Sequence, residues 1–112
     1  WFCFVIEQIL SNALKYTEKG GTIQIFIKQE SGQLWLVIED NGIGIWEEDL
    51  PRVFERGFTG YNGRADKKST GIGLYLCKRI MVRLRHQIRI ESKVGVGTQV
   101  FLGVTREELH PE

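Results

Sequence analysis

Residues 34–44 read LWLVIEDNGIG, an apolar strand that runs directly into a turn with two glycines. Leu34 to Glu39 is predicted to be the strand that returns from a hairpin turn at Ser31-Gly32, and the Asp-Asn-Gly that follows is a common turn. A turn alone does not explain the second glycine, Gly44, two residues after Gly42. A residue without Cβ lets the backbone approach a flat ligand, and the carboxylate of Asp40 can accept a hydrogen bond from an exocyclic amine. This loop is therefore a candidate binding site.

The segments around this loop predict further helices and strands. Apolar side chains recur at helical spacing on both sides of it, and runs of alternating residues lie between them. The predicted helices are Phe2–Thr17, a short one at Trp46–Glu55, and Gly71–Arg85. The predicted strands are Thr22–Glu30, Leu34–Glu39, Gln87–Ser92 and Gln99–Val104.

Two details of these elements concern burial. Ile23, Ile25 and Ile27 alternate along the first strand, which predicts that this strand is half-buried through one face. Cys3 and Cys77 lie in apolar helical patterns. We therefore expect both cysteines to be reduced packing residues of a cytoplasmic domain.

The order of the elements favours one arrangement. Helices that all pack on one face of a largely antiparallel sheet bury every apolar stripe in the chain. The 112 residues make less than one typical domain's length. We therefore predict an α+β fold, a two-layer α/β sandwich with a mixed, mostly antiparallel sheet, in a single domain that spans residues 1–112.

Composition excludes some classes of function. The formal net charge of +1 argues against a broad electrostatic interaction with nucleic acid. The longest apolar run, Trp1–Ile6, is far shorter than the ~18 residues of a membrane span. The chain has neither an initiator Met nor a basic leader, so we expect it to be part of a longer protein. Seven of the 13 glycines lie between Gly42 and Gly73, which points to function in that region.

One side of the first predicted helix carries polar side chains suited to a metal and a phosphate. Spacings of three and four residues place Gln8, Asn12, Lys15 and Tyr16 side by side. The amide oxygen of Asn12 is a suitable ligand for Mg²⁺, which takes few protein ligands and completes its shell with phosphates and water. Lys15, one turn further, is a point charge for a phosphate oxygen. A solvated polar helix face is the alternative interpretation.

The start of the last predicted helix, Thr70 to Leu74, is suited to an anion. Free N–H groups and the helix dipole favour negative charge there, and its glycines allow a polyphosphate to come close. The segment from Arg52 to Thr70 has no apolar period and a net charge of +3. Such a long loop predicts a mobile cover over phosphates, with a merely solvated loop as the alternative. Its basic residues are Arg52, Arg56, Arg64, Lys67 and Lys68.

Taken in order, these segments resemble the ATP-binding domain of bacterial sensor histidine kinases. The resemblance covers residues 1–105, and its motifs correspond to the asparagine box, first glycine box, phenylalanine box and second glycine box of that family. They are Asn12-Ala13-Leu14-Lys15-Tyr16-Thr17, Asp40-x-Gly42-x-Gly44-Ile45, Val53-Phe54-Glu55-Arg56-Gly57-Phe58 and Gly71-Ile72-Gly73-Leu74. The residues around Gln8 look closest to intramembrane-sensing kinases of the antimicrobial-peptide response.

The resemblance implies the Bergerat sandwich, with ATP or ADP and Mg²⁺ as its ligands. It implies that Asn12 binds Mg²⁺, that Lys15 contacts phosphate as a second catalytic residue, and that Tyr16 lines the nucleotide pocket. Asp40 would accept a hydrogen bond from the adenine amine. The other implied residues are Gly42, Gly44 and Ile45 at the base, Phe54 and Phe58 as anchors of the lid, and Lys67, Thr70, Gly71, Ile72, Gly73 and Leu74 near the phosphates.

Two departures from this pattern refine the expectation. Gln8 stands where hydrolytic members of the superfamily have a Glu general base, and Gln cannot accept a proton. This favours phosphoryl transfer over hydrolysis and leaves the amide oxygen of Gln8 as a further Mg²⁺ contact. The phosphoacceptor His of the family lies in an upstream helical segment, whereas His86 and His110 have no such context and are expected at the surface.

The resemblance therefore implies the catalytic domain of a two-component sensor histidine kinase. Such a domain transfers the γ-phosphoryl group of ATP to a His on a separate dimerisation domain, which in turn phosphorylates a response regulator. We expect a monomeric fragment, a homodimeric full-length kinase anchored in the bacterial plasma membrane, and no nucleic-acid partner. Two alternatives stay open: a serine kinase of the anti-sigma type with the same fold, and an interaction module that binds ATP without transferring it.

Overall fold

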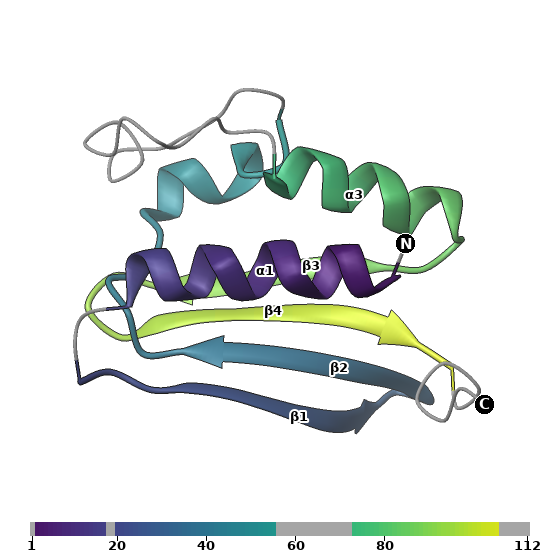
Figure 1. Ribbon diagram of the computed structural model, residues 1–112, viewed down its shortest axis with the longest axis horizontal. Coiled ribbons are helices and arrows are strands. Elements are labelled where there is room, and N and C mark those ends of the chain that lie inside the picture. The colour runs from purple at the N-terminus through teal and green to yellow at the C-terminus, as the bar shows by residue number, and fades with distance from the viewer. Residues whose placement is uncertain (1, 18–19, 56–72, 106–112) are drawn as a thin grey trace.

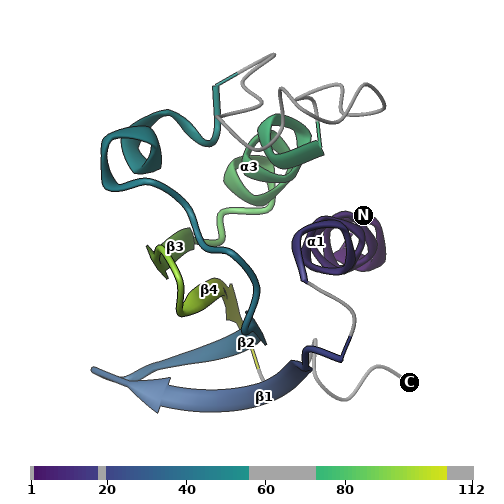
Figure 2. The ribbon, with the colours of Figure 1, turned by 90° about the vertical axis from the view of Figure 1, so that its left-hand side faces the viewer.

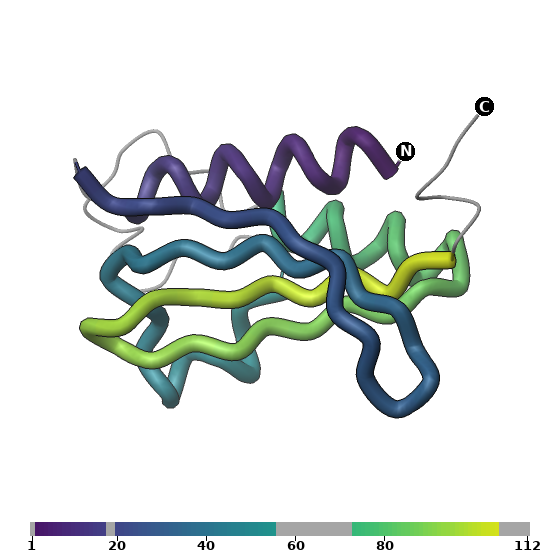
Figure 3. Tube along the Cα trace, turned by 90° about the horizontal axis from the view of Figure 1, so that it is seen from below, coloured from purple at the N-terminus to yellow at the C-terminus, as the bar shows by residue number. Residues whose placement is uncertain are grey.

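The structure is a computed structural model that describes residues 2–17, 20–55 and 73–105. Its four strands pair antiparallel in the order β1-β2-β4-β3, which Figure 3 shows from below. The helices are α1 (Phe2–Tyr16), the 3₁₀ helix η1 (Glu47–Arg52) and α3 (Gly73–Arg83). The strands are β1 (Ile23–Glu30), β2 (Gln33–Asp40), β3 (Ile88–Lys93) and β4 (Gly97–Val104).

The two α-helices lie side by side on one face of the sheet (Figures 1 and 2). Their apolar stripes, spaced by three and four residues, meet the inward-facing side chains of β2, β3 and β4. This confirms the predicted two-layer α+β sandwich. The fully buried centre of the core is formed by Val5, Ile9, Ile38, Cys77, Met81 and Leu102.

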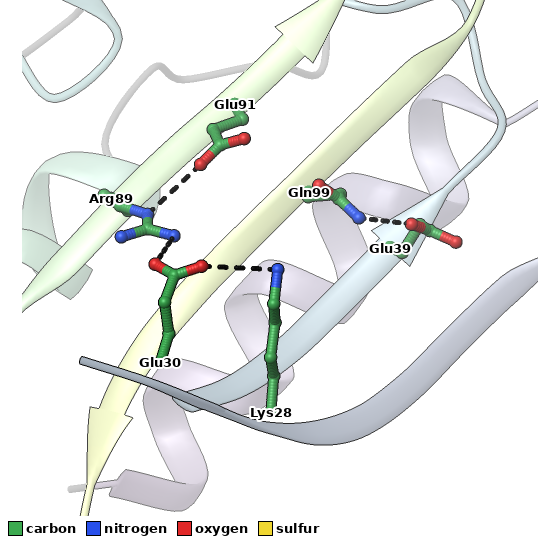
Figure 4. Close-up of polar contacts among 6 residues, drawn as sticks. All are labelled: Lys28, Glu30, Glu39, Arg89, Glu91 and Gln99. Carbon is green, nitrogen blue, oxygen red and sulfur yellow. Dashed lines mark hydrogen bonds and ion pairs between the residues drawn. The ribbon is translucent and has the colours of Figure 1, made fainter. Parts of the chain in front are cut away.

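The opposite face of the sheet carries a second, aromatic cluster. Trp35 and Phe101 meet edge to face, with ring centroids 6.1 Å apart, and Phe26 packs against them. The Arg89 guanidinium lies 4.1 Å from the centre of the Phe101 ring and 4.8 Å from that of Trp35. Glu30 and Glu91 both pair with Arg89 (Figure 4). None of the described helices covers this face, and the Arg89 guanidinium instead covers the aromatic rings by stacking on them.

Two burial predictions were wrong. Ile25 and Ile27 are 50% and 47% exposed, because β1 is the edge strand of the sheet. Among the described side chains of β1, Ile23 is the one that packs against the main core. Cys3 is exposed and only Cys77 is a packing residue; both thiols are free. Burial raises the pKa of the Cys77 thiol to about 12, which suits a buried neutral group.

Several element boundaries also differ from the predictions. The helix expected over Trp46–Glu55 is the 3₁₀ helix η1, which accommodates Pro51 near its end. α3 ends two residues earlier than predicted, with Arg85 in the left-handed region at φ 62°. His86, expected at the surface, is half-buried with its ring 6.5 Å from that of Phe2. Within the described ranges, no helix is long and apolar enough to cross a membrane.

Candidate functional site

Three neighbouring strands carry polar side chains at the same end of the sheet. Along each strand, the side chains that face the helices are apolar until the last one, which is polar. Strand register places Asp40 of β2 opposite Thr98 of β4, and Thr98 opposite Ser92 of β3. We call Asp40, Thr98 and Ser92 the inner row. At the inner row, the apolar core ends on the face of the sheet that is directed toward α1 and α3.

Asp40 is the buried carboxylate of this row, with 9% of its surface exposed. Its Oδ1 accepts a hydrogen bond of 2.8 Å from the backbone N–H of Gly42. Desolvation raises the pKa of Asp40, and the backbone N–H groups of Gly42 and Thr98 offset only part of that rise. Asp40 is therefore a buried acceptor, and a ligand that donates a hydrogen bond relieves the loss of its hydration.

The glycine loop that follows Asp40 is held between the end of α1 and the β3–β4 hairpin. A Cβ on Gly42 would lie 2.3 Å from the carbonyl oxygen of Tyr16, and the N–H of Ile43 donates to that same oxygen at 3.2 Å. Gly44 has φ +80°, and a Cβ there would lie 2.3 Å from the carbonyl oxygen of Lys93. The structure thus gives a packing reason for both glycines. Close approach of a ligand to them stays a prediction.

The polar side of α1 faces the start of α3. A Cβ on Gly73 would lie 3.1 Å from the Oε1 atom of Gln8, so these two predicted site residues adjoin each other. The side chains of Gln8 and Asn12 make no hydrogen bond to another described residue. Two amide oxygens one turn apart on a helix are suitable donors for Mg²⁺. The donor set present in the chain therefore fits this ion, which would take its remaining ligands from phosphate and water.

Other predicted site residues lie around this centre. The Lys15 ammonium is 5.7 Å from the centre of the Tyr16 ring, at the end of α1. Phe54 and Leu74 pack against the main core, and the Lys78 ammonium lies 5.5 Å from the centre of the Phe54 ring. Ile45 follows the glycine loop, and its backbone N–H donates to the Ser92 hydroxyl at 2.8 Å. Five predicted site residues lie outside the described residues: Phe58, Lys67, Thr70, Gly71 and Ile72.

Sequence reasoning missed Thr98 and Ser92. Ser92 is the last residue of one predicted strand, and Thr98 directly precedes another. Neither belongs to one of the glycine motifs singled out above. The signal that was available is the pattern itself, because in each of three strands an apolar alternation ends in a polar residue. The strand order is needed as well, because only the pairing of the strands shows that these residues form a row.

Clusters of His, Cys, Asp and Glu that could bind a metal are lacking over residues 2–17, 20–55 and 73–105. No group of three or more His, Cys, Asp or Glu side chains there could hold a metal. The Mg²⁺ donors predicted from the sequence in these ranges are the neutral amides of Gln8 and Asn12. Such a site depends on a ligand that brings its own negative charge, as a nucleotide phosphate does.

Comparison with known proteins bears on the family and the fold of the chain. Residues 2–108 match the family described as histidine kinase-, DNA gyrase B-, and HSP90-like ATPase. The chain is 43% identical over 98 residues to the sensor protein BceS of Bacillus subtilis, covering 88% of this chain and 29% of BceS. It is 46% identical over 102 residues to the sensor histidine kinase GraS of Staphylococcus haemolyticus, covering 91% and 29%. The chain thus spans less than a third of these relatives.

Solved structures share the fold. The mycobacterial sensor histidine kinase MprB superposes with a TM-score of 0.79 and 25% identity, over 90% of this chain and 69% of that one. Full-length ShkA in complex with AMPPNP gives a TM-score of 0.72 at 19% identity, over 90% and 20%. The second likeness concerns the fold alone. Both agree with the Bergerat sandwich expected from the sequence motifs.

Proposed function

Since this chain belongs to the family of histidine kinase-, DNA gyrase B- and HSP90-like ATPases, we propose that it is the ATP-binding catalytic domain of a two-component sensor histidine kinase. The observation that carries the proposal is the buried carboxylate of Asp40 at the end of the sheet, next to the glycine loop. The relatives support the kinase assignment, because BceS and GraS are named as sensor proteins or sensor histidine kinases.

The base of the nucleotide binds at the inner row. The Asp40 carboxylate accepts a hydrogen bond from the adenine amine, a group that donates and so matches a buried acceptor. Ile45 and the glycine loop form the wall on one side of the base. Because Gly42 and Gly44 pack closely against α1 and the β3–β4 hairpin, contacts within the fold itself support this wall.

The phosphates lie toward the facing sides of α1 and α3. Asn12 and Gln8 hold Mg²⁺ through their amide oxygens, and Lys15 meets a phosphate oxygen as a point charge. The bound ion neutralises charge on the phosphates, which is its contribution to the chemistry. Lys67, Thr70 and the glycines of the second glycine box complete the phosphate site, with Phe54 and Phe58 as anchors of the lid.

The reaction is transfer of the γ-phosphoryl group to a His on a dimerisation domain. Catalysis rests on positioning and on charge neutralisation, so the chain needs no general base of its own at Gln8. Gln8 lacks proton-accepting capacity, which disfavours the loss of ATP to water. The phosphorylated His then passes its phosphoryl group to a response regulator. The full kinase is a membrane-anchored homodimer of the antimicrobial-peptide-response type that the residues around Gln8 resemble.

Phosphotransfer to a separate domain tests this proposal. The chain is mixed with Mg-ATP and a dimerisation domain made from the BceS sequence, and acid-labile phosphate on that domain is measured. We expect transfer by the chain and none by the variant Asn12→Ala, because the variant loses an amide ligand for Mg²⁺. Phosphate on Ser would support the anti-sigma-type kinase instead. Tight ATP binding without transfer to any acceptor would contradict the kinase assignment.

A further inference from the structure

Ser92 forms the centre of a hydrogen-bond network behind the nucleotide site. Its Oγ accepts from the backbone N–H of Ile45 at 2.8 Å and donates to the carbonyl oxygen of Gly97 at 2.9 Å. It also lies 2.7 Å from the Oγ1 atom of Thr98. One side chain of β3 therefore touches the glycine loop, the β3–β4 hairpin and the inner row.

Counting donors and acceptors gives an assignment of the hydroxyl protons that satisfies every contact of Ser92. A Ser hydroxyl has one proton, and we assign it to the Gly97 carbonyl, which can only accept. The Ile45 N–H can only donate, and Ser92 accepts from it. The contact between the two hydroxyls must then be a donation from Thr98 to Ser92. In this arrangement Ser92 makes three hydrogen bonds and no donor is shared.

This arrangement fixes the character of Thr98. Its one hydroxyl proton is directed at Ser92, so the lone pairs of its Oγ1 are left to accept. Asp40, the strand partner of Thr98, is also an acceptor. The inner row therefore offers two acceptors side by side and no side-chain donor. This suits a base that carries an exocyclic amine at that position and disfavours a base that carries an acceptor, such as a carbonyl oxygen, there.

We propose that Ser92 is a positioning residue for nucleotide recognition, which sets Thr98 as an acceptor beside Asp40 and holds the glycine loop through Ile45. This inference rests on the proposed function of the same site. Ser92 acts on the ligand through its hydrogen-bond partners Thr98 and Ile45. Its effect is then a matter of selectivity for the 6-amino group as well as of affinity.

The test compares two ligands that differ in one group. Dissociation constants are measured by calorimetry for Mg-ATP and for the triphosphate of purine riboside, which lacks the 6-amino group. The ratio of the two constants reports the amine interaction, and it does not depend on the fraction of protein that is folded, because both ligands see the same fraction. A loss of stability alone therefore leaves the ratio unchanged.

We expect Ser92→Ala to weaken ATP binding about tenfold and purine triphosphate binding about threefold, so that the ratio falls about threefold. Ser92→Thr retains the Oγ atom and should keep a ratio near that of the wild-type protein. In a Thr98→Val background, Ser92→Ala should no longer change the ratio, since Ser92 acts on the amine through Thr98. Glu91→Gln, which changes the neighbouring side chain on the outer face, is the matched control and should leave both constants unchanged.

The outcomes separate this inference from the proposed function. An unchanged ratio in Ser92→Ala, with wild-type protein that prefers ATP, overturns the role of Ser92 and leaves the ATP site intact. A changed ratio that persists in the Thr98→Val background overturns the route through Thr98. Wild-type protein that binds both triphosphates equally, or neither, overturns the adenine site itself and with it the role of Ser92.

Discussion

Two polar rows at the same end of the sheet lie one residue apart and face opposite sides. The inner row, Asp40, Thr98 and Ser92, points toward the helices, and we call its counterpart Glu39, Gln99 and Glu91 the outer row. Both rows cross the same three strands, and each has a carboxylate on β2 opposite a polar residue on β4. They differ in what surrounds them.

In the outer row, polar side chains form hydrogen bonds and ion pairs with other side chains. The Gln99 amide donates to Glu39, and the half-buried Arg89 pairs with Glu91 and Glu30 (Figure 4). In the inner row, the Asp40 carboxylate is met by backbone N–H groups and is desolvated. The same type of group thus has side-chain partners from its own protein on one face and is kept ready for a ligand on the other.

Replacement of the inner carboxylate should have the largest effect. Asp40→Asn should weaken ATP binding about 10- to 100-fold, because a hydrogen bond to a charged group is worth about 1.5–3 kcal/mol. Calorimetric titration with Mg-ATP measures the loss. Glu39→Gln makes the same chemical change one residue away on the outer row and should leave the affinity unchanged. Equal losses in the two variants would show that the rows do not differ in function.

Removal of the cation that closes the outer face should affect stability but not binding. Arg89→Met keeps the apolar stem and loses the guanidinium stacked on Phe101 and Trp35. We expect a loss of about 1–2 kcal/mol in the free energy of unfolding, measured with urea, since desolvated cation–π contacts reach this size. ATP affinity, measured on the folded protein, should not change. A loss of affinity without a loss of stability would contradict the division between the faces.

The pH dependence of stability should also separate the rows. Burial raises the pKa of Asp40 above its ordinary value of 3.8, so the folded protein takes up this proton at higher pH than the unfolded chain does. As pH falls from neutral through the raised pKa, the wild-type protein should therefore gain stability relative to Asp40→Asn. Urea unfolding of both proteins from pH 7 downward gives this difference. A difference that is flat with pH, or that changes in the opposite direction, would contradict the raised pKa.

Removal of the outer-row amide should have the smallest effect. Gln99→Ala deletes the donor to Glu39 on a face that water reaches, so water replaces the lost hydrogen bond. We expect the free energy of unfolding to change by no more than about 0.5 kcal/mol and ATP affinity to stay constant. Thermal unfolding and calorimetry check both values. A loss of affinity comparable to that of Asp40→Asn would place the nucleotide on the wrong face of the sheet.

The local sequence patterns were sufficient to predict most of the secondary structure. Helical spacing gave α1 and most of α3, and the strands were placed to within one or two residues. The errors occur where an element's environment overrides its pattern. The alternating isoleucines of β1 predict burial, but β1 is an edge strand and leaves two of them exposed. Cys3 has apolar neighbours in the sequence, but it is exposed in the fold.

For the candidate site, the motifs located Asp40, the glycine loop and the polar side of α1, because each is a short stretch with its own chemistry. They could not locate Ser92 or Thr98. These two residues gain their meaning from strand order: β3 and β2 both pair with β4, which brings Ser92 and Asp40 to the two sides of Thr98. Hydrogen-bond partners distant in sequence are invisible to a local pattern.

The amino-acid sequence by itself determined which segments become helices and strands, and which residues have the chemistry for adenine, Mg²⁺ and phosphate, since periodicity and side-chain type are local properties. Only the tertiary structure decided which of two adjacent carboxylates, Glu39 or Asp40, is buried behind the helices, and which hydroxyls meet across the strands. The physical reason is that burial and hydrogen-bond partners depend on neighbours from other strands, and successive residues of a strand point to opposite faces.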